Sequence, residues 1–317
     1  MAERSTRTVL VALASNAVVA VAKIIAGVAS GSSAMLSEGA HSVADTTNEV
    51  FLLTALWRSS RPADRSHPFG YGMERFFWSL LAAVGIFVSG AAFSIYEGVK
   101  GLVGQPAELG NPILSYAVLG FAFITEGISL ITAVRQLRGE ARSTGRPTME
   151  HVRRSPDPTV KTVFSEDSAA LVGLAMAATG LGLRQATGAP QWDAAAALAI
   201  GLLLAFVAIR LGHGTKELLI GAAADPELRE QVWQELAGAA EVDAVVEVLT
   251  MQLAPEEVLV AARLDLVDGI DSDGLEALST RLDEELQERH PEITQVFLDA
   301  TRASAHERGR SRRITQR

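Results

Sequence analysis

Six apolar stretches follow one another through the first two thirds of the chain. A helix needs about 20 apolar residues to cross the hydrocarbon core of a bilayer. The pattern therefore predicts a membrane all-α bundle of six transmembrane helices over residues 1–217. The first stretch is longer than the roughly 7–15 apolar residues of a signal peptide, so we expect it to be retained as a span. The predicted spans are approximately 8–29, 33–57, 76–99, 112–134, 160–183 and 193–214.

The segment 218–300 shows a different pattern. Two β-branched, partly alternating runs flank a turn at Pro255 and Glu256, which predicts a hairpin. The whole segment has the order αββαβ, typical of a small α+β domain of ferredoxin-like type over 218–302. The tail, 303–317, has no apolar period and is expected to be disordered. The predicted elements are a helix over 225–239, strands over 242–254 and 256–267, a helix over 272–288 and a strand over 292–300.

Charge divides the chain in the same way. Residues 1–217 hold 18 Lys and Arg against 16 Asp and Glu, residues 218–300 hold 4 against 20, and residues 301–317 hold 6 against 1. Most of the basic residues of 1–217 fall on one side of the predicted spans. The positive-inside rule then places both termini and the acidic domain in the cytoplasm. We expect a multi-pass protein of a bacterial-type inner (plasma) membrane, with the lipid bilayer as a partner.

Composition excludes several classes of protein. The chain has no cysteine, so it has no disulfide scaffold, zinc ribbon or thiol catalyst. The acidic domain would repel phosphates, which argues against binding to nucleic acid. No HExxH motif is present, so an intramembrane metalloenzyme is not expected and the chain is interpreted as a non-enzyme.

Ionisable residues within the predicted spans are the main functional signal, because a charge at membrane depth is costly. The second span carries Glu38, His41, Asp45 and Glu49, and the fifth carries Glu166 and Asp167. His41 and Asp45 are four residues apart and project from one helix face. Lys23, in the first span, either neutralises a neighbouring carboxylate or extends its ammonium toward the interface.

The depths of Asp45 and Asp167 are consistent with a shared site. At 1.5 Å per residue, Asp45 lies about 18 Å below the outer surface. Asp167 lies about 20 Å below it if the core is about 30 Å thick. One imidazole and two carboxylates at one level suit a small divalent cation such as Zn²⁺. The alternative is a buried hydrogen-bond or ion-pair network that fixes helix packing.

Three motifs resemble the cation diffusion facilitator family, the zinc transporter family. They are SEGAHSVADTTNEV in the second span, RPADRSHPFGYGMER in the following loop and FSEDSAALVG in the fifth span. The resemblance covers about residues 8–300 and is greatest to the zinc-transporter-nine-like branch. It implies six spans, a cytoplasmic αββαβ domain and export of divalent metals.

The resemblance also implies metal ligands. His41, Asp45 and Asp167 match transport-site positions. The family usually has another ligand four residues before that Asp, but Val163 stands there and cannot coordinate. Glu166 is the nearest substitute, and a water molecule or Asn48 is the alternative.

A second metal site is implied in the loop after the second span. Asp64 and His67 match two of its ligands, but Tyr71 stands where a third His is often found. A solvated loop that shapes the turn into the third span is the alternative. The acidic domain resembles the family's dimerisation and metal-sensing module, which implies a homodimer. That module often holds His-rich sites, but residues 218–300 contain a single histidine, His290.

The expected activity is efflux of Zn²⁺ in exchange for protons by alternating access. Protonation competes with metal for the same ligands, because these must be deprotonated to bind it. A carboxylate-rich site with one His leaves Mn²⁺, Fe²⁺ and Co²⁺ open as substrates. A membrane scaffold that senses metal without transporting it is the remaining alternative.

Overall fold

The computed structural model describes residues 2–104, 110, 112–143, 147–154 and 157–304. Its contacts form two compact units. The helical unit contains the described residues of 1–61 and 74–216. The sheet unit contains residues 62–73 and the described residues of 217–317. The predicted tail lies outside the described residues from 305 onward.

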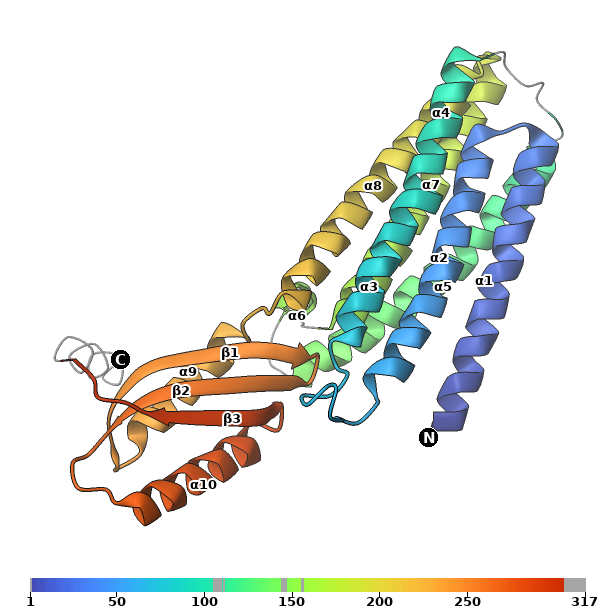
Figure 1. Cartoon of the computed structure of the whole chain (residues 1–317). Helices are drawn as coiled ribbons and strands as arrows, with labels where there is room; N and C mark the ends of the chain where they lie inside the picture. The colour runs from blue at the N-terminus through green and yellow to red at the C-terminus, as the bar shows by residue number, and fades with distance from the viewer. Residues whose placement is uncertain (1, 105–109, 111, 144–146, 155–156, 305–317) are drawn as a thin grey trace. The chain divides into compact units, whose positions relative to one another are not determined.

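Long helices occupy all six predicted positions in the helical unit, and they run side by side (Figure 1). Among the described residues, four helical segments are long and apolar enough to cross a membrane. These are Glu74–Val103, Pro112–Gly139, Val160–Thr187 and Gln191–Leu219. A short helix that the sequence did not predict, α6, joins the fourth and fifth positions. The helices are α1 (Ala2–Ser30), α2 (Ser33–Ser59), α3 (Glu74–Gly85), η1 (Ile86–Ala92), α4 (Phe93–Val103), α5 (Pro112–Ser143), α6 (Thr148–Arg154), α7 (Pro158–Thr187) and α8 (Gln191–Leu219).

The third predicted helix is interrupted by a π-helical segment, η1, between α3 and α4. A π-helical turn inserts one extra residue, and such segments occur frequently at functional sites. Gly90 of η1 lies against Ala44 of α2 and Leu204 of α8. The irregular segment therefore packs directly beside the residue that precedes Asp45.

The helices pack closely where glycines face them. A Cβ atom added to Gly98 of α4 would lie 2.6 Å from the backbone nitrogen of Leu198 in α8, and one added to Gly201 would lie 2.7 Å from the backbone nitrogen of Ile95. Small residues allow backbones to approach in this way within lipid. Glycines of both helices thus set the separation of α4 from α8.

A buried polar cluster joins three segments at the end of the unit that carries the α1–α2 and α7–α8 connections. Asp193 of α8 accepts hydrogen bonds from the Ser32 hydroxyl (2.6 Å) and the Ser33 backbone N–H (2.7 Å). Arg184 of α7 pairs with Asp193 at 3.2 Å and donates to the Gly31 carbonyl at 3.1 Å. Gly31 adopts a φ of 64°, which suits glycine at this turn. Ser32 also caps α2, because its hydroxyl accepts a hydrogen bond from the backbone N–H of Met35.

The sheet unit has the predicted order αββαβ. Strands β1 (Val242–Ala254) and β2 (Glu257–Leu266) are antiparallel, and β2 pairs in parallel with β3 (Ile293–Ala300). Helices α9 (Pro226–Gly238) and α10 (Ser272–Arg289) cover one face of this sheet (Figure 1). One apolar core joins both helices to the alternating inward residues of β2, as the strand period requires. Its members include Leu236, Leu282, Val258, Val260 and Leu264.

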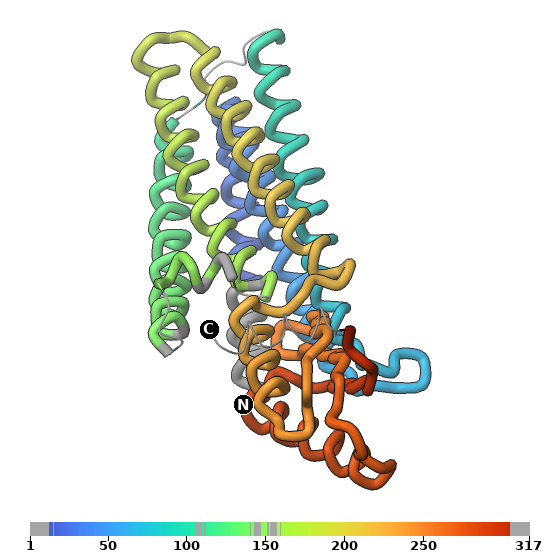
Figure 2. The backbone as a smooth tube through the Cα atoms, turned by 90° about the vertical axis from the view of Figure 1, so that its left-hand side faces the viewer, coloured from blue at the N-terminus to red at the C-terminus, as the bar shows by residue number. Residues whose placement is uncertain are grey.

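The loop 62–73 packs within the sheet unit, although it connects α2 to α3 in sequence. The ring of Phe69 meets the ring of Phe297 edge to face, with centroids 6.4 Å apart. Gly72 approaches Ala254 so closely that a Cβ atom there would lie 2.5 Å from the alanine methyl group. Figure 2 shows the loop beside the strands from a second direction.

Candidate metal site within the helical bundle

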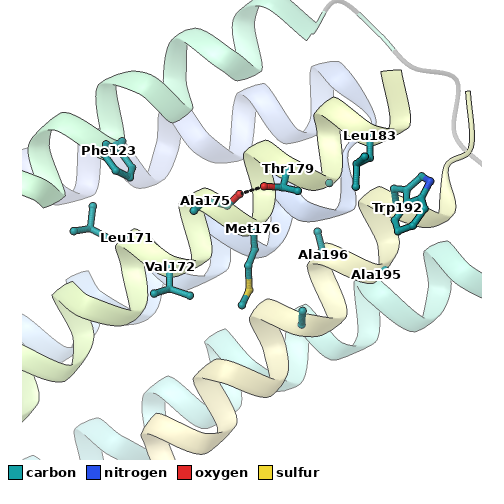
Figure 3. Close-up of a pocket in the computed structure, with 12 residues that line it drawn as sticks. Phe123, Leu171, Val172, Ala175, Met176, Thr179, Leu183, Trp192, Ala195 and Ala196 are labelled. Atoms are coloured by element: carbon teal, nitrogen blue, oxygen red, sulfur yellow. Dashed lines mark hydrogen bonds between the residues drawn. The ribbon is translucent and has the colours of Figure 1, made fainter. Parts of the chain in front are cut away.

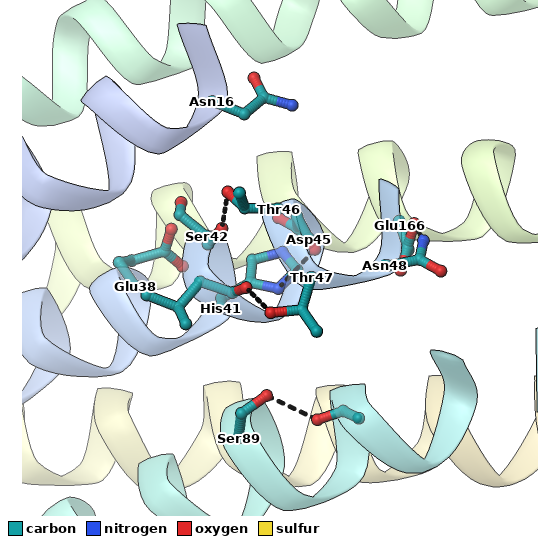
Figure 4. Close-up of polar contacts among 12 residues, drawn as sticks. Asn16, Glu38, His41, Ser42, Asp45, Thr46, Thr47, Asn48, Ser89 and Glu166 are labelled. Carbon is teal, nitrogen blue, oxygen red and sulfur yellow. Dashed lines mark hydrogen bonds and ion pairs between the residues drawn. The ribbon is translucent and has the colours of Figure 1, made fainter. Parts of the chain in front are cut away.

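One face of α2 carries all the ionisable residues of that helix's interior together with the amide of Asn48. Glu38, His41, Asp45, Asn48 and Glu49 are spaced by three, four, three and one residues, so they fall within about 100° around the helix. Figure 4 shows Glu38, His41, Asp45 and Asn48 following one another along α2. A polar face of this kind inside an apolar bundle is expensive unless its groups are paired or bind an ion.

His41 and Asp45 are adjacent but not hydrogen-bonded. Their side chains are 1% and 17% exposed, and His41 Nδ1 lies 3.4 Å from Asp45 Oδ1. Both ring nitrogens of His41 and Asp45 Oδ1 are buried without a hydrogen-bond partner in the part of the chain that the structure describes. Buried polar atoms are usually paired, so these atoms are available as ligands.

The two neighbouring carboxylates of α7 face different helices. Glu166 is 8% exposed and accepts a short hydrogen bond from the Asn48 amide of α2. Its other oxygen, Oε1, is buried without a hydrogen-bond partner among the described residues. Asp167 instead accepts from the Ser129 hydroxyl of α5 at 2.9 Å. Glu166 is therefore the α7 carboxylate directed at the polar face of α2.

Two further contacts tie the polar face of α2 to α1. The Lys23 ammonium lies 3.1 Å from Glu38 Oε2, with both side chains fully buried. The Asn16 amide donates to Glu49 at 2.6 Å. Of the two alternatives for Lys23, the structure has the one in which it neutralises a neighbouring carboxylate.

Comparison with known families decides where this arrangement belongs. The cation efflux transmembrane domain matches this chain over residues 9–220. The chain belongs to the cation efflux family. The predicted resemblance to cation diffusion facilitators is thus confirmed.

Several cation efflux proteins are similar to it in sequence. "Proton-coupled zinc antiporter SLC30A9, mitochondrial" from Homo sapiens is 34% identical over 259 residues, 82% of this chain and 45% of the relative. "Metal tolerance protein C4" from Arabidopsis thaliana is 35% identical over 264 residues, 83% of this chain and 57% of the relative. "Cation-efflux pump FieF" from Serratia proteamaculans is 25% identical over 284 residues, 89% and 88% of the two chains. The chain spans about half the length of the first two, and these likenesses confirm the predicted zinc-transporter-nine-like branch.

The predicted ligands of this cation efflux protein are neighbours, but they are not gathered around one point. Across the described residues, no three His, Asp or Glu side chains lie close enough together to hold one metal ion. His41 and Asp45 lie on the polar face of α2, Glu166 meets α2 at Asn48, and Asp167 lies toward α5. Val163 offers no ligand atom, so the role of each residue stays a prediction.

Sequence reasoning missed Glu126 of α5. This carboxylate is close enough to interact electrostatically with Asp45, Glu166 and Asp167. It lies one helical turn before Ser129, the partner of Asp167. The rule that an ionisable residue in a span is a functional candidate applies to Glu126 within the fourth predicted span, and it would have found this residue.

The second predicted metal site is a turn held by its own hydrogen bonds. Asp64 Oδ1 accepts from the backbone N–H groups of Ser66 and His67, each at 2.8 Å, and Oδ2 accepts from the Tyr71 hydroxyl at 2.8 Å. These bonds, that of Tyr71 first, hold the pKa of Asp64 below its usual range. The His67 and Tyr71 rings stack with centroids 4.2 Å apart. Both Asp64 oxygens are thus engaged, which favours the structural alternative for this loop.

An apolar hollow lies elsewhere on the helical unit. It has a volume of about 620 Å³ and is lined by α5, α7 and α8, including Phe123, Met176 and Trp192 (Figure 3). The one hydroxyl in its lining, that of Thr179, donates to its own helix at Ala175. An apolar hollow without free ligand atoms suits contact with lipid and does not suit a cation.

Proposed function

We propose that this protein exports divalent metal cations across a membrane in exchange for protons, with Zn²⁺ as the leading substrate. The observation that carries the proposal is a set of buried ligand atoms on α2 and α7 that have no hydrogen-bond partner among the described residues: both nitrogens of His41, Asp45 Oδ1 and Glu166 Oε1. A divalent cation bound there would take one nitrogen of His41 and carboxylate oxygens of Asp45 and Glu166 as ligands once these side chains approach one another. Zinc is favoured because it accepts imidazole nitrogen and carboxylate oxygen.

The proposed ligands are His41 and Asp45 of α2 with Glu166 and Asp167 of α7. Since the described side chains are not gathered around one point, we infer that α7 and α2 approach when the cation binds. The short hydrogen bond from Asn48 to Glu166 would orient that carboxylate toward α2. Partners of metal ligands commonly act in this way.

Protons and metal would compete for the same side chains. Carboxylates and imidazole bind a cation only when deprotonated, so release of metal is favoured where protons are abundant. His41 is part of this competition, because an imidazole binds metal only in its neutral form. Four relatives carry names that describe proton-coupled zinc antiport, and these names support the proposal.

The finer topology is part of the same proposal. All six long helices would cross the membrane, with both termini and the sheet unit on the cytoplasmic side of a plasma membrane. The polar face of α2 explains why that helix has lower hydropathy than the four clear candidates. A homodimer through the sheet unit is proposed from the family resemblance.

The proposal is tested by zinc uptake into proteoliposomes that hold the purified protein, with a zinc indicator inside and an imposed pH gradient. We expect gradient-dependent uptake by the wild-type protein and loss of at least about 90% of it in Asp45→Ala. Thr47→Val is the matched control, because the Thr47 hydroxyl bonds only to its own helix at Val43. Full uptake by a folded Asp45→Ala protein would overturn the site.

A panel of Mn²⁺, Fe²⁺ and Co²⁺ in the same vesicles ranks the substrates. The observation that keeps these metals open is the excess of carboxylates over imidazole, because such a site is harder than a two-histidine site. Uptake of one of them faster than zinc at equal concentration would replace zinc as the leading substrate.

A further inference from the structure

The Lys23–Glu38 ion pair is the one pair in the described residues in which both side chains have no solvent exposure at all. The ammonium and Glu38 Oε2 are 3.1 Å apart, and both side chains are 0% exposed. Removing two charges from solvent is costly, and apolar residues of similar volume often stabilise a core at least as well. Helix packing alone therefore gives no reason for this pair.

The pair borders the proposed transport site. Glu38 precedes His41 by three residues on the same face of α2 (Figure 4). The Lys23 ammonium is close enough to interact electrostatically with His41, Asp45 and Glu126. The other buried cation of the described chain, Arg184, is held by Asp193 and the α1–α2 turn. Lys23 is thus the cation that balances the carboxylates around Asp45.

The pair also contacts the helix that carries Glu166. Glu38 Oε1 has no hydrogen-bond partner among the described residues. It lies against Gly173 of α7, where an added Cβ atom would collide with it. Glycine at position 173 thus gives the carboxylate its place between α2 and α7. Glu38 Oε2 pairs with the Lys23 ammonium, and Glu38 Oε1 faces α7, the helix that we propose approaches α2 when metal binds.

We propose that Lys23 is a tethered counter-cation that limits how tightly the site holds its metal. Without metal, its ammonium offsets part of the negative charge of Glu38, Asp45 and their neighbours. When a divalent cation binds, it and the Lys23 ammonium repel one another across a medium of low dielectric constant. The inference rests on the proposed function and adds a residue to it: a positioning charge that touches no metal but sets its affinity, so that the cargo can leave.

The test compares zinc affinity at a fixed pH of about 7 in full-length protein in detergent, by isothermal titration calorimetry. Asp45→Ala supplies the background from sites outside the bundle. Lys23→Met should bind zinc about tenfold or more tighter, because an uncompensated carboxylate remains. Glu38→Gln should bind it about tenfold or more weaker, because an uncompensated ammonium remains. A tenfold change in affinity has the size expected when one unit charge several ångströms from the metal is left without its counter-charge.

The opposite changes in zinc affinity expected for Lys23→Met and Glu38→Gln distinguish a charge effect from a packing role. The double variant Lys23→Met/Glu38→Gln should return to within about threefold of wild type, and Lys23→Arg should match wild type. If Glu38 were itself a ligand, the double variant would stay as weak as Glu38→Gln, and the inference would be wrong. Unchanged affinity in both single variants, or weakening in both, would also overturn it.

Two readouts keep the result interpretable. Thermal unfolding followed by circular dichroism reports folding, and Lys23→Gln replaces Lys23→Met if the latter does not fold. In proteoliposomes, Lys23→Met should lower KM and kcat together, because metal enters readily but leaves slowly. If wild-type protein binds and transports no divalent metal, the proposed function fails as well. If wild type transports normally and Lys23→Met behaves identically, only the counter-cation is rejected.

Discussion

Asn48 of α2 donates a hydrogen bond to Glu166 of α7, and this bond joins the two helices one turn beyond Asp45. It leaves Glu166 Oε1 without a partner among the described residues. The hydrogen bond holds the Glu166 carboxylate toward α2. Asp167, the other candidate ligand of α7, is instead hydrogen-bonded to Ser129 of α5. This bond therefore favours Glu166 over Asp167 as the α7 carboxylate that binds metal together with Asp45.

Asn48→Ala should weaken zinc binding about 10- to 100-fold, as loss of the partner of a metal ligand commonly does. Glu166→Gln should weaken it at least as much as Asp167→Asn. Calorimetry on the purified variants measures both effects, with Thr47→Val as the control for a polar residue on the same helix. A Glu166→Gln protein with wild-type affinity would return the α7 ligand role to Asp167 alone.

The Arg184–Asp193 pair should be a major contributor to the stability of the helical unit. Asp193→Ala removes the carboxylate that pairs with the buried Arg184 guanidinium at 3.2 Å. Breaking one side of a buried pair costs about 3–5 kcal/mol. Unfolding in detergent measures this loss, and Arg184→Leu/Asp193→Leu should recover much of it. A loss below about 1 kcal/mol in Asp193→Ala would mean that the pair is not structurally important.

Glycine packing gives a matched pair of variants. Gly98→Ala should destabilise by about 1–3 kcal/mol, because its methyl group would press on the backbone of α8 at Leu198. Gly120→Ala in α5 meets nothing within 4 Å and should stabilise by up to about 1 kcal/mol through helix propensity. Melting temperatures of the two proteins should move in opposite directions. Similar shifts for both would contradict the close α4–α8 contact.

The Asp64 turn should depend on pH. Because its hydrogen bonds hold the folded pKa of Asp64 below the ordinary value, they stabilise the turn at pH above about 3.9. That contribution is lost as the pH falls through the lowered folded pKa. Titration of the Asp64 carboxyl ¹³C signal measures this, and Tyr71→Phe should move the midpoint upward toward the ordinary value. A midpoint unaffected by Tyr71→Phe would argue against the Tyr71 hydrogen bond as the main cause.

Much of the architecture was predictable because it depends on composition over long windows. All six helix positions and the αββαβ order follow from apolar length and from a change of period from 3.6 to 2. The hairpin turn between Ala254 and Glu257 was also predicted correctly. The π-helical segment Ile86–Ala92 was not, because one inserted residue changes the phase of a helix without changing its composition.

For the candidate site, the sequence predicted the residue types but not which helix each side chain faces. His41, Asp45, Glu166 and Asp167 were identified by the cost of placing charge in a membrane. Which of two adjacent carboxylates faces α2 depends on helix rotation, and the sequence does not fix this rotation for a helix with several polar faces. The pairing of Lys23 with Glu38 was one of two open alternatives, since it depends on how α1 packs against α2.

The most direct test of the account counts zinc ions and protons in the same vesicles. Proteoliposomes loaded with a zinc indicator and a pH indicator would receive zinc outside under an imposed pH gradient. If export is coupled to protons, zinc entry is accompanied by proton exit, and both fluxes are lost together in Asp45→Ala and in Glu166→Gln. Zinc entry without proton movement, or entry that persists in Asp45→Ala, would contradict it.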